Sequence, residues 1–422
     1  MRPRPPLPSG PFLIVGLARS GTAAALALHE RGEHAIGVDA GAPAGLQRLS
    51  EAGIEVHAQA DGLAELERVQ AVIKSPGVTA QAAVIVRART NGIPVLGELE
   101  LAWRLLPNEF IAVTGTNGKT TTTELIGHIH REAGLPVAVA GNVGTALSSF
   151  IDRLPPQATI VCETSSFQLE DTIAFAPEAA VLLNLTPDHI DRHGTMQAYT
   201  AAKLEIFARQ GEHDLAVLPR DLAGVDEVGG RGRRVYFGGD LNGGDVSLRG
   251  EHNLQNAMAA AAVCLARGID PEAVRAGLRS FAGVPHRLEE VARREGVLYV
   301  NDSKATNVAS TLVALSAFPG AAVHLILGGQ GKDQDFTPLA AAVEERATAV
   351  YLIGKDASLI AAALAGVTVP VSACATLEQA LEAASAAATP GAVVLLSPGC
   401  ASFDQFADFE ARGARFRELV QR

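Results

Sequence analysis

Aromatic and sulfur-containing residues are scarce in this chain. Aromatic side chains account for 5% of the 422 residues, and only one tryptophan is present. The four cysteines, Cys162, Cys264, Cys374 and Cys400, are far apart and form no Cys-x-x-Cys pair. The sequence therefore argues against a disulfide framework or a cysteine-rich zinc site, and it predicts buried free thiols in a reducing compartment.

Basic residues do not dominate the charge balance. Lys and Arg total 35 against 46 for Asp and Glu, a formal net charge of -11. This balance argues against nonspecific binding to nucleic acid or to anionic membranes, because both need a basic surface. Apolar runs are broken well short of the ~20 residues that span a bilayer. The Arg- and Pro-rich N-terminus lacks the apolar core of a signal peptide. We expect a soluble, cytoplasmic monomer.

Short apolar runs typical of β-strands alternate with longer Ala- and Leu-rich helical stretches along the whole chain. This alternation predicts the α/β fold class, with βα repeats around mostly parallel sheets. Turn residues before Phe110 and at Gly283–Pro285 divide the repeats into sets. We predict three consecutive α/β domains: a Rossmann-like domain over residues 1–97, a central P-loop ATPase domain over 98–285 and a second Rossmann-like domain over 286–422.

The sharpest local pattern is a phosphate-binding loop. An apolar run from Phe110 leads into Thr-Gly-Thr-Asn-Gly-Lys119-Thr120, and a helical stretch follows. Glycines let backbone N–H groups surround phosphate oxygens, the lysine reaches the β- and γ-phosphates, and the threonine hydroxyl coordinates Mg²⁺. Val113 stands where the general motif has glycine, so the match is imperfect. The alternative is a glycine-rich turn with an exposed lysine. The residues predicted to bind ATP here are Gly115, Thr116, Asn117, Gly118, Lys119, Thr120 and Thr121.

A weaker glycine pattern lies near the N-terminus. Residues 16–21 read Gly-Leu-Ala-Arg-Ser-Gly, and Asp39 ends the next apolar run. The pattern is similar to a dinucleotide-binding fingerprint, but Ala18 replaces its middle glycine. Taken alone, it allows an NAD-dependent dehydrogenase.

From the phosphate loop onward, the sequence resembles the Mur ligase and folylpolyglutamate synthetase superfamily over nearly the whole chain. Single motifs are weak, but these occur in the family's order: Ala140-Gly-Asn-Val-Gly144, Glu163-Thr-Ser-Ser-Phe-Gln-Leu-Glu170, Asn184-Leu-Thr-Pro-Asp-His189, Tyr199-Thr-Ala-Ala-Lys203, Gly250-Glu-His-Asn-Leu-Gln-Asn256, Asn301-Asp-Ser-Lys-Ala-Thr306 and Ser397-Pro-Gly-Cys-Ala-Ser402. The last two resemble the branch that adds D-glutamate. The resemblance implies an ATP-dependent ligase that joins D-glutamate to UDP-N-acetylmuramoyl-L-alanine through an acyl phosphate, in peptidoglycan precursor synthesis.

The resemblance also implies catalytic roles for Lys119, Glu163, His189 and Lys203. Thr120, Glu163, His189 and Lys203 would hold two Mg²⁺ ions, with Lys203 carbamylated by CO₂ because an ammonium group cannot ligate a cation. Both Glu163 and Lys203 have a plainer alternative. Taken alone, Glu163 reads as a solvated acid at a strand end, and Lys203 as an exposed helix lysine paired with Glu205 or another surface acid.

Substrate contacts follow from the same resemblance, and the three domains would hold the UDP substrate, ATP and the amino acid in chain order. Asn256, Arg287 and Asp302 would add to the ATP site. After Asp39 the chain reads Ala-Gly where the family tends to carry Thr-Arg, so one expected UDP contact is missing. The UDP-substrate set is Arg19, Ser20, Asp39, Ser75, Gly77, Asn142, Ser165 and His189. The D-glutamate set is Thr306, Lys332, Ser402, Phe403 and Phe409, although Phe403 and Phe409 also read as core residues.

Three other functions fit part of the sequence. A folylpolyglutamate synthetase-like ligase shares the ATP chemistry, but the C-terminal motifs favour the D-glutamate branch. A dehydrogenase leaves the phosphate loop without a role. A non-catalytic nucleotide sensor does not need Lys119, Glu163 and Lys203 together.

Overall fold

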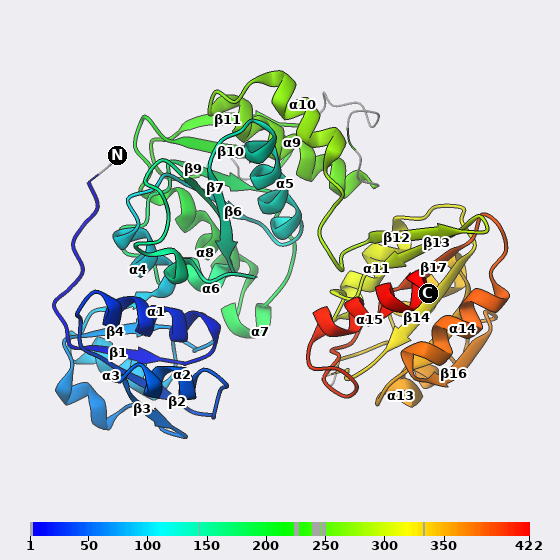
Figure 1. Cartoon of the computed structure of the whole chain (residues 1–422), viewed down its shortest axis with the longest axis horizontal. Coiled ribbons are helices and arrows are strands. Elements are labelled where there is room, and N and C mark those ends of the chain that lie inside the picture. The colour runs from blue at the N-terminus through cyan, green and yellow to red at the C-terminus, as the bar shows by residue number, and fades with distance from the viewer. Residues whose placement is uncertain (1–2, 143, 223–227, 239–245, 247–249, 332–333) are drawn as a thin grey trace. The chain divides into compact units, whose positions relative to one another are not determined.

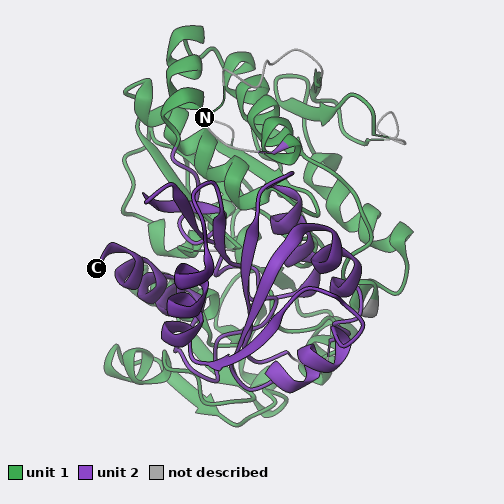
Figure 2. Cartoon of the chain, turned by 90° about the vertical axis from the view of Figure 1, so that its right-hand side faces the viewer, with its two compact units in different colours: residues 1–247, 251–281 green, residues 248–250, 282–422 purple. Residues whose placement is uncertain are grey.

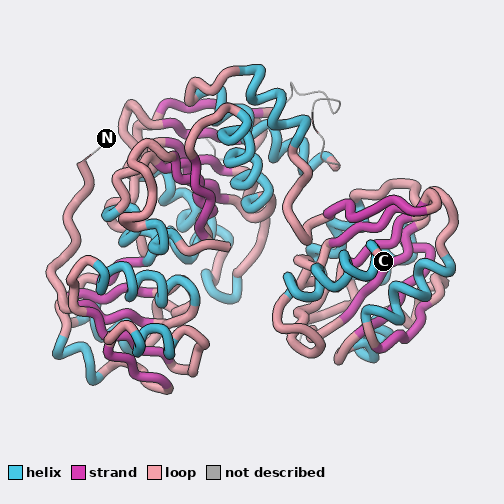
Figure 3. The backbone as a smooth tube through the Cα atoms, in the orientation of Figure 1, coloured by secondary structure: helices cyan, strands magenta, loops and turns pink. Residues whose placement is uncertain are grey.

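The structure, a computed structural model, describes residues 3–142, 144–222, 228–238, 246, 250–331 and 334–422. The chain divides into two compact units (Figure 2): residues 1–247 with 251–281, and residues 248–250 with 282–422. The described residues form three sheets (Figure 1), two in the first unit and one in the second. Helices accompany the strands of every sheet, as the backbone tube in Figure 3 shows.

The first sheet is fully parallel and has the order β3-β2-β1-β4-β5. Its strands are β1 (Phe12–Val15), β2 (Ala35–Asp39), β3 (Glu55–Ala58), β4 (Ala71–Lys74) and β5 (Val95–Gly97). Its helices are α1 (Arg19–Glu30), α2 (Leu46–Glu51), η1 (Ala64–Arg68) and α3 (Ala83–Thr90), and α4 (Glu98–Leu105) leads to the next sheet. The strand order reverses between β1 and β4, and ligands of open α/β sheets bind at such a point, beyond the strand ends.

The second sheet is also parallel and has the order β11-β10-β9-β6-β8-β7. Its strands are β6 (Phe110–Thr114), β7 (Val137–Gly141), β8 (Thr159–Glu163), β9 (Ala179–Leu182), β10 (Leu215–Pro219) and β11 (Arg233–Phe237). Its helices are α5 (Lys119–Glu132), η2 (Leu147–Phe150), α6 (Ser166–Leu169), α7 (Ile190–His193), α8 (Met196–Ala208), α9 (Glu251–Ala266) and α10 (Pro271–Ser280). All five residues of β6 are buried, as expected for a central parallel strand covered on both faces.

The third sheet has the order β12-β13-β17-β14-β15-β16, and only the β12–β13 pair is antiparallel. Its strands are β12 (Glu289–Arg294), β13 (Val297–Asn301), β14 (Val323–Gly328), β15 (Ala347–Ile353), β16 (Val371–Ala375) and β17 (Val393–Leu396). Its helices are α11 (Val308–Ser316), α12 (Leu339–Arg346), α13 (Ala357–Ala363), α14 (Leu377–Ala387) and α15 (Phe409–Gln421).

A cluster of aromatic residues lies in the core of the second sheet. Trp103 and Phe110 both meet Phe175 edge-on, with ring centroids 5.8 and 6.3 Å apart. The Arg4 guanidinium lies 4.6 Å from the centre of the Trp103 ring and donates to the Asn108 carbonyl. A cation–π contact and a hydrogen bond therefore hold the N-terminal segment against α4 and the segment before β6.

The predicted fold class, three α/β domains with mostly parallel sheets, is confirmed. The domain boundaries after residues 97 and 285 stay predictions. The four cysteines are free and buried. Within the described ranges, no helix is both long enough and apolar enough to cross a membrane.

Candidate active site

The predicted phosphate loop joins β6 to α5. Gly118 has a left-handed backbone, with φ of 84°, and any Cβ there would lie 2.1 Å from Oδ1 of Asn256. The position therefore requires glycine for both its conformation and its space. The same contact places Asn256, a predicted ATP contact on α9, directly against the loop.

Two lysines converge on the backbone of this loop. The Lys119 Nζ donates to the carbonyls of Gly115 and Thr116 at 3.0 and 2.9 Å. The Lys203 Nζ, from α8, donates to the same Gly115 carbonyl at 2.8 Å. Burial, and then the charge of Lys119, lower the pKa of Lys203 to about 7.

The plainer alternative for Lys203 is wrong. Only 2% of this residue is exposed. Glu205, its suggested partner, instead pairs with Arg209 at 2.8 Å. Lys203 is therefore not a surface residue, and the cost of burying its amine is reduced by the hydrogen bond to Gly115 and by the lowered pKa.

A buried carboxylate lies beside the start of α5. The Thr120 hydroxyl donates to Oε2 of Glu163 at 2.8 Å, and the Asn142 amide lies 3.4 Å from Oε1. Glu163 is 3% exposed, so it is not the solvated strand-end acid of the alternative reading. A hydroxyl and a carboxylate in contact are a suitable donor pair for Mg²⁺, which prefers oxygen ligands.

His189 lies at the N-terminal end of α7, in a left-handed conformation with φ of 51°. Its ring contacts Phe167 of α6 at a centroid distance of 4.8 Å. Among the residues that the structure describes, no group of three His, Cys, Asp or Glu side chains is placed to hold a metal. The Mg²⁺ set of Thr120, Glu163, His189 and Lys203 stays a prediction, and it would need phosphate and water oxygens as further ligands, as is usual for this ion.

The N-terminal glycine loop joins β1 to α1. A Cβ at Gly21 would lie 1.8 Å from the Gly16 carbonyl, so the turn depends on this glycine. The Ser75 hydroxyl donates to that same carbonyl at 2.6 Å, which brings the segment after β4 against the loop. The Asp39 carboxylate accepts from the backbone N–H groups of Leu17 and Gly41 at 2.6 and 2.7 Å. Asp39 therefore shapes the loop itself.

The remaining predicted UDP contacts are distributed around these two loops. Ser20 lies in the first turn of α1. At Gly77, no heavy atom lies within 4 Å of the position that a Cβ would take. Asn142 follows β7, and its backbone N–H donates to the Glu163 carbonyl at 3.0 Å. Ser165 is the N-cap of α6 and shares a capping box with Gln168.

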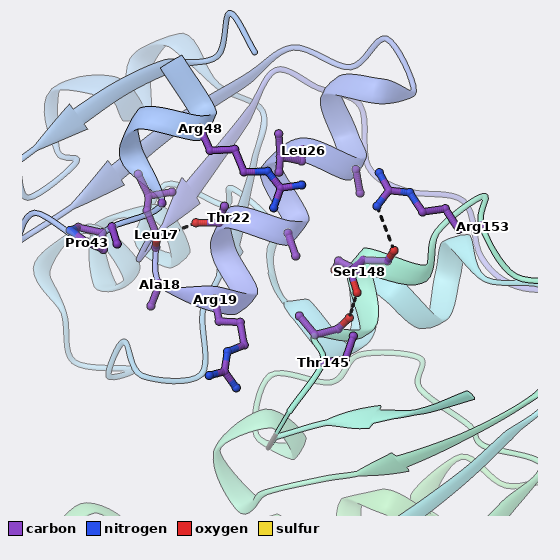
Figure 4. Close-up of a pocket in the computed structure, with 16 residues that line it drawn as sticks. Leu17, Ala18, Arg19, Thr22, Leu26, Pro43, Arg48, Thr145, Ser148 and Arg153 are labelled. Carbon is purple, nitrogen blue, oxygen red and sulfur yellow. Dashed lines mark hydrogen bonds between the residues drawn. The ribbon is translucent and has the colours of Figure 1, made fainter. Parts of the chain in front are cut away.

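A pocket of about 670 Å³ opens beside the N-terminal loop (Figure 4). Its walls come from residues 17–27 on and before α1, residues 43–48 at α2, and residues 145–153 around η2. Three arginines line it: Arg19 donates to the Gly144 carbonyl at 2.8 Å, Arg153 pairs with Glu30 at 2.7 Å, and Arg48 belongs to α2. Arg48 was not predicted, and a lone arginine on a short helix gives no signal in the sequence.

The second unit carries the other predicted contacts. Burial raises the pKa of Asp302 to about 7, although its carboxylate accepts from the Ser397 hydroxyl and the Leu288 N–H. Arg287, just before Leu288, acts on that carboxylate electrostatically. Thr306 lies between β13 and α11, and Ser402 is buried in the segment before α15.

Phe409 begins α15, whereas Phe403 is 64% exposed, so reading Phe403 as a core residue is wrong. Lys332 lies outside the described residues. Sequence reasoning missed Arg412, which is fully buried and donates to the Ser303 hydroxyl and to the Cys400 carbonyl. It braces the segments that carry Ser402 and Phe409. In the sequence, the burial of Arg412 would have been indicated only by a charged residue on the apolar face of a predicted helix.

Comparisons with known proteins agree with this arrangement. Residues 113–237 match the Mur ligase middle domain, and residues 286–400 match the Mur ligase, glutamate ligase domain. UDP-N-acetylmuramoylalanine--D-glutamate ligase of Acidobacterium capsulatum is 41% identical, over 97% of this chain and 95% of that protein. The chain belongs to the Mur ligase family.

A second relative carries the same name. The UDP-N-acetylmuramoylalanine--D-glutamate ligase of Pelotomaculum thermopropionicum is 42% identical over 97% of this Mur ligase and 96% of its own length. Among solved structures, UDP-N-acetylmuramate-alanine ligase of Thermotoga maritima has a TM-score of 0.62 at 21% identity and covers 98% of this chain and 99% of its own. MurF of Acinetobacter baumannii has a TM-score of 0.60 at 20% identity and covers 83% and 85%. These two structures share the fold.

Proposed function

We propose that this Mur ligase adds D-glutamate to UDP-N-acetylmuramoyl-L-alanine with conversion of ATP to ADP and phosphate, in peptidoglycan precursor synthesis. The family consists of ATP-dependent ligases that form amide bonds. The observation that carries the chemistry is the phosphate loop with Lys119 and the Thr120–Glu163 contact beside it. The substrates follow from the two relatives that match along nearly their whole lengths.

The proposed reaction has two steps. An oxygen of the L-alanine carboxylate attacks the γ-phosphorus of ATP, which gives an acyl phosphate and ADP. The amine of D-glutamate then attacks the carbonyl carbon, loses a proton, and expels inorganic phosphate as the amide forms. Lys119 stabilises the charge on the transferring phosphoryl group, and the loop N–H groups hold the remaining phosphates.

Magnesium ions in this site would be held by Thr120 and Glu163 on one side and by His189 with Lys203 on the other. Bound there, Mg²⁺ supplies positive charge to phosphate oxygens. The contact between Thr120 and Glu163 supports the first position, since both donors are already adjacent. Asn142, whose amide lies 3.4 Å from the Glu163 carboxylate, is proposed to contact the substrate.

The Lys203 side chain is proposed to be a carbamate. Its Nζ would attack the carbon of CO₂ and lose a proton. The product carries a negatively charged CO₂ group on the nitrogen, and the oxygens of this group can ligate a metal. The reaction requires a neutral amine. Burial and the neighbouring Lys119 lower the pKa of Lys203 to about 7, so much of the amine is neutral at physiological pH.

The UDP substrate and D-glutamate are assigned to residues in the N-terminal and C-terminal parts of the chain. The loops at Gly16 and Ser75 would hold the diphosphate, with Arg19, Ser20, Asp39, Gly77 and Ser165 around them. Thr306, Ser402, Phe403, Phe409 and Lys332 would hold D-glutamate, and Arg287 and Asp302 would complete the ATP site. We also propose a cytoplasmic location, since ATP and the nucleotide substrate are supplied in the cytoplasm. A monomeric state is proposed as well.

Phosphate release tests this function directly. The purified protein with ATP, Mg²⁺ and UDP-N-acetylmuramoyl-L-alanine should release phosphate only when D-glutamate is added. A panel of L-glutamate, L-alanine and diaminopimelate provides the control. Equal rates with any of these, or a requirement for a folate in place of the UDP substrate, would contradict the proposal.

A further inference from the structure

The segment after β4 is held by hydrogen bonds to the N-terminal glycine loop and within itself. Ser75 donates its hydroxyl to the Gly16 carbonyl, and the Val78 N–H donates to the Ser75 carbonyl at 3.0 Å. Residues 75–78, called here the Ser75 loop, therefore close onto the N-terminal glycine loop. Under the proposed function both loops contact the diphosphate of the UDP substrate.

A buried ion pair fixes the start of the Ser75 loop. Lys74, the last residue of β4, contacts Asp171 at 2.5 Å, and the two side chains are 1% and 2% exposed. Asp171 follows α6, and its own carbonyl accepts from the Gly97 N–H at 3.3 Å. Buried ion pairs contribute little net stability compared with apolar side chains of the same volume. The contact joins the end of β4 to the segment that follows α6.

A second cation holds the other end of the Ser75 loop. Arg192 of α7 donates to the carbonyls of Pro76 and Val78 at 3.3 and 3.5 Å. Its guanidinium lies 3.7 Å from the centre of the Phe167 ring, which fixes its direction. Phe167 and Asp171 belong to one stretch of chain, between Glu163 and α7.

The Ser75 loop is thus tied at both ends to the stretch that begins at Glu163. We propose that Lys74, Asp171 and Arg192 are positioning residues that set the Ser75 loop for the UDP substrate. They act through the loop backbone and do not touch the reacting atoms. This inference rests on the proposed function, because it concerns the same substrate.

The test replaces the buried pair by apolar side chains, Lys74→Met with Asp171→Leu. Binding of UDP-N-acetylmuramoyl-L-alanine, measured by calorimetry without ATP, should weaken about tenfold, the effect of losing about 1.4 kcal/mol of contact energy. The KM for this substrate should rise by the same factor, whereas the KM for ATP and kcat should not change. The exposed pair between Glu55 of β3 and Arg68 of η1 provides the matched control, Arg68→Met with Glu55→Leu, which should bind like wild type.

Each outcome decides between a positioning role and a purely structural one. A folded Lys74→Met, Asp171→Leu variant with wild-type affinity would overturn the proposal. If this variant does not fold, Arg192→Gln decides, because that side chain is partly exposed and acts on the other end of the loop. Unchanged affinity in Arg192→Gln would likewise overturn it. Failure of the wild-type protein to bind the UDP substrate would instead contradict the proposed function.

Discussion

The two glycine-rich loops of the first unit have the same place in their sheets, but different side chains surround them. Each follows a central parallel strand, β1 or β6, and each leads into a helix. The loop at Gly16 is contacted by the Ser75 hydroxyl and by an Asp39 carboxylate that accepts from the Leu17 backbone N–H, and arginines line the pocket beside it. Around the loop at Gly115, two lysines and the Thr120–Glu163 contact converge.

The difference separates holding a phosphate from transferring one. Backbone N–H groups at a helix N-terminus suffice to bind a diphosphate. Phosphoryl transfer also requires charge placed where negative charge develops. The same strand–loop–helix unit can therefore serve both tasks within one chain, and the side chains added around it decide which task it performs.

The largest expected effect concerns Lys119. Lys119→Ala should lower kcat by about a thousandfold, because a donor aimed at the transferring phosphoryl group is lost. Phosphate release measures the rate, and circular dichroism checks the fold. Lys355→Ala, an exposed lysine in the second unit, is the control and should keep wild-type activity. Near-normal turnover in Lys119→Ala would remove the difference between the two loops.

Lys203→Ala should lower kcat by about a hundredfold, the scale of losing one preorganised electrostatic group. Added formate or acetate should restore part of the activity by occupying the vacated oxygen position. The same additives should leave Lys119→Ala inactive, which distinguishes a missing metal ligand from a missing cation. Full activity of Lys203→Ala, or a free amine seen in electron density next to bound metal, would end the carbamate proposal.

A smaller effect is expected at the first loop. Arg19→Ala should raise the KM for the UDP substrate about tenfold with kcat unchanged, because it removes binding that is equal in ground state and transition state. Steady-state kinetics with ATP and D-glutamate saturating provide the measurement. Arg31→Ala removes an exposed pair with Asp152 and should have no effect. A fall in kcat for Arg19→Ala would give the first loop a part in the chemistry.

The smallest effect is a pH dependence of stability. In CO₂-free buffer the folded protein holds Lys203 with a pKa of about 7, against 10.5 for the ordinary side chain. Between these values the unfolded chain binds more protons, so the free energy of unfolding should rise with pH, by roughly 1 kcal/mol per pH unit. Lys203→Met should lack this rise. Urea unfolding of both proteins at pH 7 and pH 9 measures the free energy of unfolding. An equal change in the wild-type protein and in Lys203→Met would contradict the burial argument.

The sequence predicted the parts that depend on local patterns. The run from Phe110 to Thr120 predicts strand, loop and helix because glycine spacing and apolar runs are local properties. Burial of Lys203 was not apparent from spacing, since it depends on α8 packing against the loop at Gly115. The Lys74–Asp171 contact joins residues 97 positions apart and carries no local pattern. Arg412 and Arg48 were missed for the same reason.

One measurement tests most directly the claim that the second loop activates the substrate carboxylate. UDP-N-acetylmuramoyl-L-alanine is labelled with ¹⁸O in both oxygens of its L-alanine carboxylate and turned over with ATP and D-glutamate. Mass spectrometry of the released phosphate should find one ¹⁸O atom per molecule, because the acyl phosphate keeps a substrate oxygen on phosphorus when the amide forms. Unlabelled phosphate, released at the rate of amide formation, would contradict the account.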